Sequence, residues 1–370
     1  MNVKKNNVKN LCDIGIMALL VVCSVAFVLI LGCVNEPTNT ENDSNKGYLG
    51  MSLSADFKIF DGKSPWNSPI GENPEIDPNS DIMIQALIKS LKEELNREKP
   101  ALGGNYKEWT SPIHVIDADK SPKKDVPTTD TEGCLYETVD PDHNGIAEGI
   151  PLPDGVWADP SEDGHMILVD PKKRIVWEFS RAYQTKSRGW EASCIDMWDL
   201  NGPGYREPFS GTYWWKSGVR GSGVPYIAGL IRPEEIEIGE INHALAIGTP
   251  VNRLKISEDV EWRMELCSPV ASRTDGWRIG PQYIPEGARI QLDPNLDIDS
   301  LNLSEEAKII ARTLQKYGAF VVDNAGGLPL YFQNLGPDGG KWGGHPGLRD
   351  ITKIPLNEFR VLKCNIVVKK

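Results

Sequence analysis

Residues able to perform acid–base chemistry concentrate between positions 157 and 247, a stretch with six of the eleven tryptophans and two of the five histidines. The candidate catalytic residues in it are Asp163, His165, Glu178, Asp196 and His243. Aromatic rings stack on the flat face of a sugar ring, while carboxylates bind its hydroxyls and exchange protons with the glycosidic oxygen. The stretch therefore predicts a carbohydrate site with acid–base groups.

His165 and Glu178 are expected to lie near each other across a β-hairpin whose turn falls at residues 171–174. A loop with an even number of residues pairs Ile167 with Glu178 and places His165 and Glu178 on one face, about 7–8 Å apart at the backbone. An odd loop places them on opposite faces. If their face is buried, Glu178 gains the raised pKa of a general acid, whereas on a solvent face it is an ordinary glutamate.

Asp163 comes two residues before His165, and a carboxylate beside an imidazole raises the pKa of the histidine and fixes its tautomer. The alternative is a polar turn that opens a strand. His243 is expected on a strand face with three aliphatic residues, so it is either a core residue with a hydrogen-bond partner or a base that points into a cavity.

Other residues are candidates for binding a substrate or a metal. The substrate candidates are Trp157, Trp190, Trp198 and Asp323, with a tryptophan core and a simple Asp-Asn-Gly turn as the alternatives. Residues 140–148 resemble the first nine positions of an EF-hand calcium loop, with candidate ligands Asp140, Asp142, Asn144 and Glu148. Pro151 occupies the position of the bidentate glutamate, so an Asp/Asn/Gly turn is the alternative to a calcium site.

The elements that must position these residues are mostly short strands. Apolar residues at helical spacing predict helices over residues 80–97 and 304–317, the second with Ser304 as its cap and Gly318 past its end. Short apolar runs separated by turn residues predict strands at 165–170, 174–179, 210–215, 226–231, 241–247, 288–292, 318–323, 328–332 and 359–368. Many strands with few helices favour a single mainly β domain over residues 48–370, a β-sandwich or jelly roll with two peripheral helices.

The N-terminus has the pattern of an export signal. Three lysines precede an apolar run over residues 14–31, and the ending of that run resembles the lipobox of bacterial lipoproteins. That resemblance implies cleavage after residue 32 and lipidation of Cys33, while an uncleaved membrane anchor over residues 1–32 is the alternative. Residues 33–47 are polar and suit a tether, so we expect the folded domain on the extracellular face of the membrane.

Composition and missing motifs exclude several classes of function. A net charge of −12 gives no support to nucleic-acid binding, and the sequence lacks the P-loop, zincin and nucleophile-elbow motifs. Beyond Cys33, four cysteines remain, at positions 134, 194, 267 and 364. In an oxidising compartment they allow up to two disulfides, in any of three pairings.

Several short motifs resemble a set of secreted, poorly characterised bacterial and archaeal β-rich proteins. They are Trp66-Asn-Ser-Pro, Asp163-Gly-His, Trp177-Glu-Phe, Gly229-Leu-Ile-Arg-Pro, Asn242-His-Ala-Leu and Val322-Asp-Asn. The likeness covers residues 60–335 and implies one domain over that span and an exported protein. It implies no activity and no site residues.

These observations favour a secreted, membrane-tethered enzyme that cleaves a polysaccharide or envelope glycan. It would act either as a glycosidase with Glu178 and Asp196 as its carboxylates or as a lyase with His165 or His243 as its base. A non-catalytic glycan-binding or cell-envelope protein is the alternative from another class, and a peptidase is a third. No cofactor other than calcium is expected.

Overall fold

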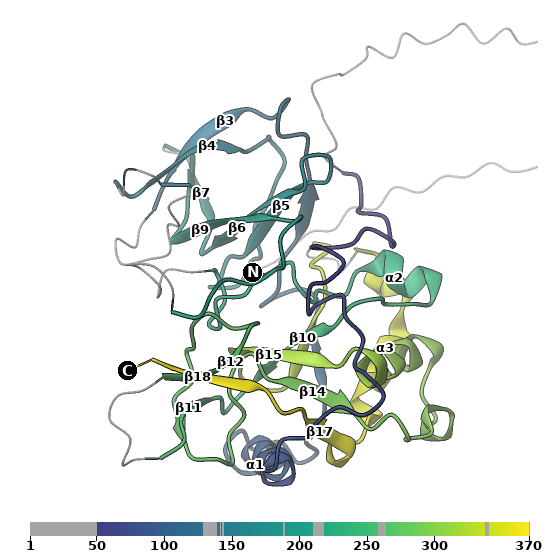
Figure 1. Ribbon diagram of the computed structural model, residues 1–370. Helices are drawn as coiled ribbons and strands as arrows, with labels where there is room; N and C mark the ends of the chain where they lie inside the picture. The colour runs from purple at the N-terminus through teal and green to yellow at the C-terminus, as the bar shows by residue number, and fades with distance from the viewer. Residues whose placement is uncertain are drawn as a thin grey trace, which may run out of the picture. The chain divides into compact units, whose positions relative to one another are not determined.

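The computed structural model describes residues 50–128, 139–140, 142, 144–187, 189–209, 218–257, 264–336 and 340–369. Residues Ser44–Lys370 form one compact unit. Within its described part, strands outnumber helices and are arranged in several sheets, which confirms the prediction of a β-rich chain (Figure 1).

Two larger sheets organise this unit. The six-stranded sheet has the order β1 (Gly103–Asn105), β16 (Pro329–Tyr331), β10 (Leu245–Thr249), β15 (Ala319–Asn324), β14 (Arg289–Leu292) and β17 (Phe359–Val361). The four-stranded sheet has the order β2 (Ile113–Val115), β5 (Met166–Asp170), β6 (Ile175–Ser180) and β9 (Cys194–Asp199). Both sheets are mixed, because β1 and β16, β10 and β15, and β2 and β5 pair in parallel.

Four two-stranded ribbons complete the described strands. They are β3 (Lys123–Pro127) with β4 (Ile146–Pro151), β7 (Tyr183–Thr185) with β8 (Gly189–Glu191), β11 (Arg253–Lys255) with β13 (Arg278–Ile279), and β12 (Met264–Ser268) with β18 (Asn365–Lys369). The described α-helices are α1 (Ser80–Glu93), α2 (Pro233–Ile238) and α3 (Glu305–Lys316). Short 3-10 turns occupy Ile298–Leu301, Gly340–Gly344, Pro346–Lys353 and Leu356–Glu358.

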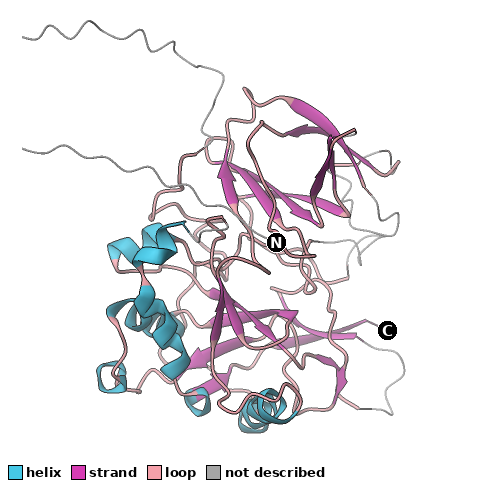
Figure 2. Ribbon diagram, turned by 180° about the vertical axis from the view of Figure 1, so that it is seen from behind, coloured by secondary structure: helices cyan, strands magenta, loops and turns pink. Residues whose placement is uncertain are grey.

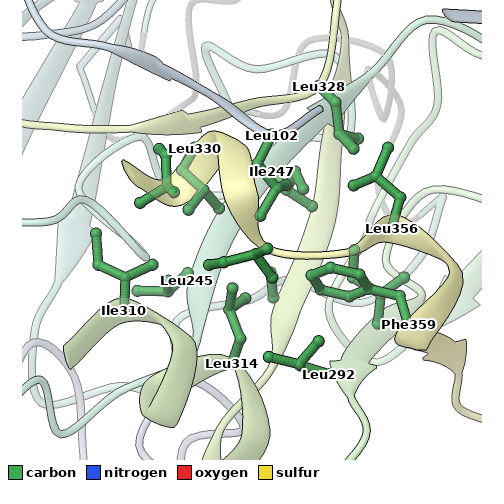
Figure 3. Packing of buried hydrophobic residues seen from close by; sticks show 14 of the residues in the cluster. Leu102, Leu245, Ile247, Leu292, Ile310, Leu314, Leu328, Leu330, Leu356 and Phe359 are labelled. Atoms are coloured by element: carbon green, nitrogen blue, oxygen red, sulfur yellow. The ribbon is translucent and has the colours of Figure 1, made fainter. Parts of the chain in front are cut away.

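The six-stranded sheet is buried on both faces. Leu245 and Ile247 of β10 point into a core shared with α1 and α3, where Ile310 and Leu314 pack against them (Figure 3). Ala246, between them, points into a second core that also holds residues of β2, β5, β6 and β9. The alternation of large and small residues along β10 therefore lets helices cover one face while the other joins the core of the four-stranded sheet.

The finer prediction of a sandwich or jelly roll is not confirmed. The six-stranded sheet contains two parallel pairs, and helices α1 and α3 pack on one of its faces (Figure 2). Antiparallel sandwiches lack both features, because parallel neighbours require crossover connections.

Local signals identified two of the three described α-helices, α1 and α3. Helix α3 begins after Ser304, whose hydroxyl accepts the N–H of Ala307, and Gly318 follows it with a φ of 64°. Helix α1 ends at Glu93, earlier than predicted, and the hydroxyl of Ser80 accepts the N–H of Val361 and does not cap the helix. Helix α2 was not predicted, since its six residues are too few to show a helical period.

The predicted strands are confirmed where the pattern is local. In the β5–β6 hairpin Ile167 pairs with Glu178, which is the register of an even loop. Residues 226–231 are not a strand, because the first two N–H groups of this segment bond to a carboxylate and only Ile231 bridges to Phe332. The predicted strand over 359–368 is divided into β17 and β18, and residues 210–215 lie outside the described residues.

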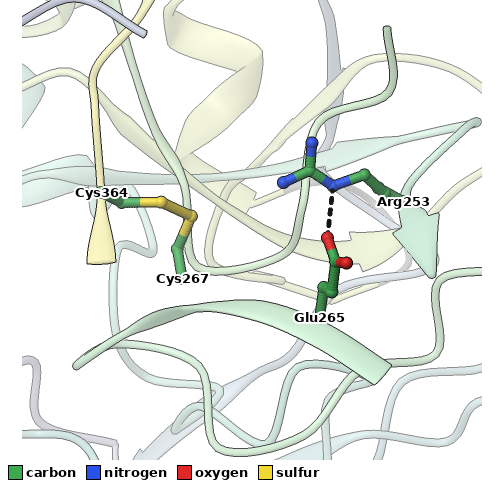
Figure 4. The surroundings of a disulfide bond; sticks show 4 residues. All are labelled: Arg253, Glu265, Cys267 and Cys364. Carbon is green, nitrogen blue, oxygen red and sulfur yellow. Dashed lines mark ion pairs between the residues drawn. A yellow bond between two sulfur atoms is a disulfide. The ribbon is translucent and has the colours of Figure 1, made fainter. Parts of the chain in front are cut away.

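A disulfide joins Cys267 of β12 to Cys364, directly before β18 (Figure 4). Of the three pairings that the sequence allows, only one contains this bond. Glu265, on the same strand as Cys267, pairs with Arg253 at 3.4 Å. Within the described ranges no helix is long and apolar enough to cross a membrane, and the apolar run at residues 14–31 and Cys33 lie outside those ranges.

Candidate functional site

A cavity of about 1140 Å³ gathers polar side chains from both larger sheets. Asp163 and His165 reach it from the chain that leads into β5, Asp323 from the end of β15, and Tyr331 from β16. Tyr226, in the segment after residue 218, also lines it. The cavity therefore lies where the four-stranded sheet and the six-stranded sheet meet.

Asp323 is the most perturbed acid that lines this cavity. Its Oδ1 accepts the N–H of Gly221 at 2.7 Å, and its Oδ2 lies 3.8 Å from Nε of Arg220. Burial raises the pKa of Asp323 to about 7, although the positive charge of Arg220 acts in the opposite direction. Asp323 is thus divided between its acid and carboxylate forms near neutral pH.

Arg220 lies against the wall of the cavity with a fully buried side chain. Its guanidinium carbon is 4.1 Å from the ring centre of Tyr226 and 4.6 Å from that of Tyr331. One nitrogen donates to the carbonyl of Tyr226, while Nε and Nη1 have no hydrogen-bond partner. The two aromatic faces and Asp323 therefore stabilise a buried positive charge.

His165 presents a free ring nitrogen beside Asp163. Its Nδ1 lies 3.2 Å from the carbonyl of Phe179, which can only accept, so Nδ1 carries the hydrogen and Nε2 keeps a lone pair. Nε2 is 4.0 Å from Oδ2 of Asp163. The imidazole also packs on the ring of Tyr226, at 4.1 Å between ring centres.

Burial lowers the pKa of His165 to about 3. The expectation that Asp163 raises this pKa is wrong, because desolvation of the charged imidazole outweighs a carboxylate that is itself 47% exposed. Burial raises the pKa of Asp163, and Arg181 opposes that shift. His165 is therefore neutral at physiological pH, and its low pKa makes it a weak base.

Glycine allows the turn that connects these two residues. Gly164 has a φ of 46°, and a Cβ placed there would lie 2.9 Å from the backbone nitrogen of Ala182. The turn between Asp163 and His165 therefore packs directly on the chain that follows β6, and no larger residue fits.

Glu178 and Asp196 are not part of this cavity. They pair in register across β6 and β9, and both are fully buried. The two oxygens of Glu178 accept the N–H groups of Tyr226 and Ile227 at 2.7 and 2.8 Å. Asp196 binds Arg206 at 2.5 and 2.8 Å and the N–H of Gly218 at 3.0 Å. They hold the segment that carries Arg220 and Tyr226, so the structure does not support them as a catalytic pair.

His243 also lies away from the cavity lining. Its Nε2 is 3.0 Å from Oε1 of Glu235, and its Nδ1 is 2.9 Å from the carbonyl of Ala244. Glu235 in turn accepts from the guanidinium of Arg232 at 2.6 Å. His243 precedes β10 and is not on a strand, so the predicted strand face is wrong, but its two hydrogen bonds match the alternative of a core residue with a hydrogen-bond partner.

The predicted tryptophans do not line the cavity either. Trp190 and Trp198 are buried, and Arg206 stacks on Trp198 at 3.7 Å. Trp157 packs edge-on against His114 at 5.5 Å. Of the predicted substrate-binding residues, only Asp323 reaches the cavity.

Trp109, Arg220, Tyr226 and Tyr331 were not predicted. The sequence predicts a strand over residues 226–231, and that prediction gives no indication that Tyr226 lines a cavity. The run of glycines at 218, 221 and 223 was the available signal for a close-packed loop at Arg220, since a Cβ at Gly221 would lie 2.3 Å from Asp275.

The predicted calcium loop folds as a turn in its described part. Asp140 accepts the N–H groups of Asn144 and Gly145 at 3.0 and 3.1 Å, and Asp142 and Glu148 are exposed. Residues 141 and 143 lie outside the described residues. Among the residues that are described, no group of three or more His, Cys, Asp or Glu could hold a metal, so calcium binding stays a prediction.

Comparison of the chain with protein-family models, with curated proteins and with solved structures finds no match. The function must therefore be argued from the cavity itself.

Proposed function

We propose that this protein is a glycan-cleaving enzyme that works in the cavity around Asp323. The observation that carries this proposal is the pairing of two unlike carboxyls in one cavity. Asp323 has 17% of its side chain exposed and a pKa that burial raises to about 7, while Asp163 is half exposed near Arg181. An acid that holds its proton up to near-neutral pH and a more solvated carboxylate in the same cavity are the two kinds of group that glycoside hydrolysis uses.

In the proposed reaction, the carboxyl of Asp323 gives its proton to the glycosidic oxygen as the bond from that oxygen to the anomeric carbon breaks. The carboxylate of Asp163 takes a proton from a water molecule, and the resulting oxygen bonds to the anomeric carbon. A second proton exchange with solvent restores both residues. The charge of Arg220 limits the proton affinity of Asp323 and so helps its proton to leave.

Elimination is a second candidate reaction, favoured by the lone pair on Nε2 of His165. As a base, this nitrogen would remove the proton beside the carboxylate of a uronic acid, and the bond to the leaving sugar would break with formation of a double bond. The two reactions give different products, since only elimination leaves an unsaturated sugar.

We also infer that the enzyme acts outside the cell and is held to its membrane. The apolar run at residues 14–31, the lipobox-like ending at Cys33 and the polar tether support this proposal. The Cys267–Cys364 disulfide supports it too, because disulfides persist in oxidising compartments.

The test is release of sugar from a panel of polysaccharides that includes envelope glycans. We expect new reducing ends without ultraviolet absorbance if Asp323 and Asp163 hydrolyse the bond, and absorbance of unsaturated uronate if His165 eliminates. Retention on glycans without release of any product, at any pH between 5 and 8, would instead make the protein a non-catalytic glycan binder.

A further inference from the structure

Trp109 lines the cavity in an unfavourable backbone conformation. Its φ of 59° is in the left-handed region, where a bulky residue is rare, and 46% of the residue is exposed. Exposure of the indole and the left-handed backbone conformation are each unfavourable, so contacts with the surrounding structure must hold Trp109 in this position. Such positions cluster where a protein binds a ligand.

Four hydrogen bonds enforce this conformation. The N–H of Trp109 donates to Oδ2 of Asp159 at 3.1 Å and to the hydroxyl oxygen of Ser161 at 3.3 Å. Its carbonyl accepts from Asn105 at 2.9 Å and from the hydroxyl of Tyr226 at 3.4 Å. Asp159 is itself buried and accepts from Asn334 at 2.9 Å. The indole is thus held at the cavity by groups that contact its backbone, which leaves its ring face for a ligand.

Three exposed cations also line the cavity: Arg97, Lys99 and Arg181. None of them forms an ion pair within the described ranges of the chain. The charges of Arg97 and Lys99 are therefore available to a ligand, while Arg181 also acts on Asp163. The guanidinium groups of Arg97 and Arg181 suit planar or tetrahedral anions.

The charge balance of the cavity is opposite to that of the chain. The whole sequence has 40 Lys and Arg against 52 Asp and Glu. The cavity lining contains four Lys and Arg residues, namely Arg273 and the three exposed cations. It contains three acidic residues: Asp163, Asp275 and Asp323. The lining thus has one more cation than carboxyls, in contrast to the acidic chain as a whole, and this local balance favours an anionic ligand over a cationic one.

We propose that the cavity binds an acidic glycan, with the indole of Trp109 stacked on one sugar ring and the Arg97, Lys99 and Arg181 cations paired with anionic groups along the strand. This deepens the proposed function and rests on it for the identification of the ligand as a glycan. Carboxylate and sulfate groups are both recognised by such cations, so the two kinds of acidic glycan are separate arms of the test.

The experiment is calorimetric titration of the full chain with three oligosaccharides of equal length: an oligogalacturonate, a sulfated oligosaccharide and a neutral glucan. We expect an acidic probe to bind at least about tenfold more tightly than the neutral one, and its affinity to fall as salt is raised. A triple variant, Arg97→Gln with Lys99→Gln and Arg181→Gln, should lose at least about tenfold in affinity for the acidic probe.

The matched control removes three exposed cations outside the cavity lining, by Lys63→Gln, Lys89→Gln and Lys92→Gln. We expect this control to bind within about twofold of the unmodified chain, because distant exposed charges are screened. Trp109→Gly should also lose about tenfold in affinity. Glycine adopts positive φ freely, so this variant removes the ring without disturbing the backbone. Trp109→Phe should restore most of the binding.

Equal binding of the neutral and acidic probes, or equal losses in the two triple variants, would overturn this inference and leave the proposed cleavage reaction in place. Binding of no probe would overturn it as well. Tight binding of an acidic probe with no cleavage of the corresponding polymer would sustain the inference and overturn the enzymatic proposal.

Discussion

Two groups of titratable residues in this molecule each contain one carboxyl with a pKa of about 7, but the surroundings of these two carboxyls differ. The cavity group consists of Asp163, His165 and Asp323, and the β6–β9 pair consists of Glu178 and Asp196. Burial raises the pKa of both Asp323 and Glu178 to about 7. Both oxygens of Glu178 accept backbone N–H groups, however, whereas Asp323 uses one oxygen for Gly221 and lines a cavity.

A raised pKa alone therefore does not identify a catalytic acid. A carboxyl whose acceptors are all used by the backbone orders the chain around it, and a substrate cannot reach its proton. A carboxyl with the same pKa and an open side can exchange that proton with a substrate. Substitutions in one group at a time test this distinction.

The largest effect is expected for Asp323→Asn. The amide keeps an acceptor for the N–H of Gly221 but cannot donate the proton that the reaction needs, so turnover should fall by about 10²–10⁴-fold. Initial rates on the best substrate of the panel would measure it, with circular dichroism to show that the variant is folded. Turnover within threefold of the unmodified enzyme would remove Asp323 from the mechanism.

Glu178→Gln should affect stability, not turnover. One of the two N–H groups that Glu178 accepts would then face an amide NH₂, and a buried donor without a partner costs about 1–3 kcal/mol. Denaturant unfolding would measure the loss, and the rate per folded molecule should stay within about twofold. A hundredfold loss of rate in folded Glu178→Gln protein would show that the β6–β9 pair takes part in catalysis.

The pH dependence should separate the two groups again. Because Asp323 acts with its proton on, turnover should fall roughly tenfold per pH unit above about 7. The raised pKa of Glu178 stabilises the folded state fully below its unfolded value of 4.5, and this contribution is lost as pH rises through about 7. Glu178→Gln should therefore flatten the dependence of the unfolding free energy on pH without moving the rate profile.

The smallest effect is expected for His243→Ala. His243 bonds to Glu235 and to the carbonyl of Ala244 and does not line the cavity, so turnover should change by less than about twofold. His165→Ala is the matched variant, because it removes the histidine that does line the cavity. Steady-state rates of the two variants would check that His165, and not His243, belongs to the active cavity. Equal losses of activity in the two variants would contradict this assignment.

What the sequence could predict was set by the range of the interactions involved. The cap and the C-terminal glycine of α3 are encoded within a few residues, and so is the turn that fixes the register of β5 and β6. The region around Tyr226 was predicted wrongly because its N–H groups bond to Glu178, 48 residues away in the sequence. No local pattern contains such a contact.

The residues of the cavity were also only partly predictable from local sequence. Asp163 and His165 could be recognised as a pair because one glycine separates them, but nothing near them indicates that Asp323 lies in the same cavity. The positions of Trp109 and Arg220 depend on partners distant in the sequence. Asp159 binds the backbone of Trp109, and the ring of Tyr331 packs against the charged group of Arg220. Of the residues predicted for a site, Asp163, His165 and Asp323 line the cavity, whereas Glu178, Asp196 and His243 do not.

The Cys267–Cys364 bond also decides which part of the chain would carry a mechanical force. Tension between the C-terminus and the segments before β12 would pass from Cys364 directly to Cys267 through the covalent bond. Residues 268–363, which include Asp323, Tyr331 and helix α3, form a loop outside that path. A pull on the C-terminal end would unzip β18 from β12 while the strand that carries Asp323 remained without load.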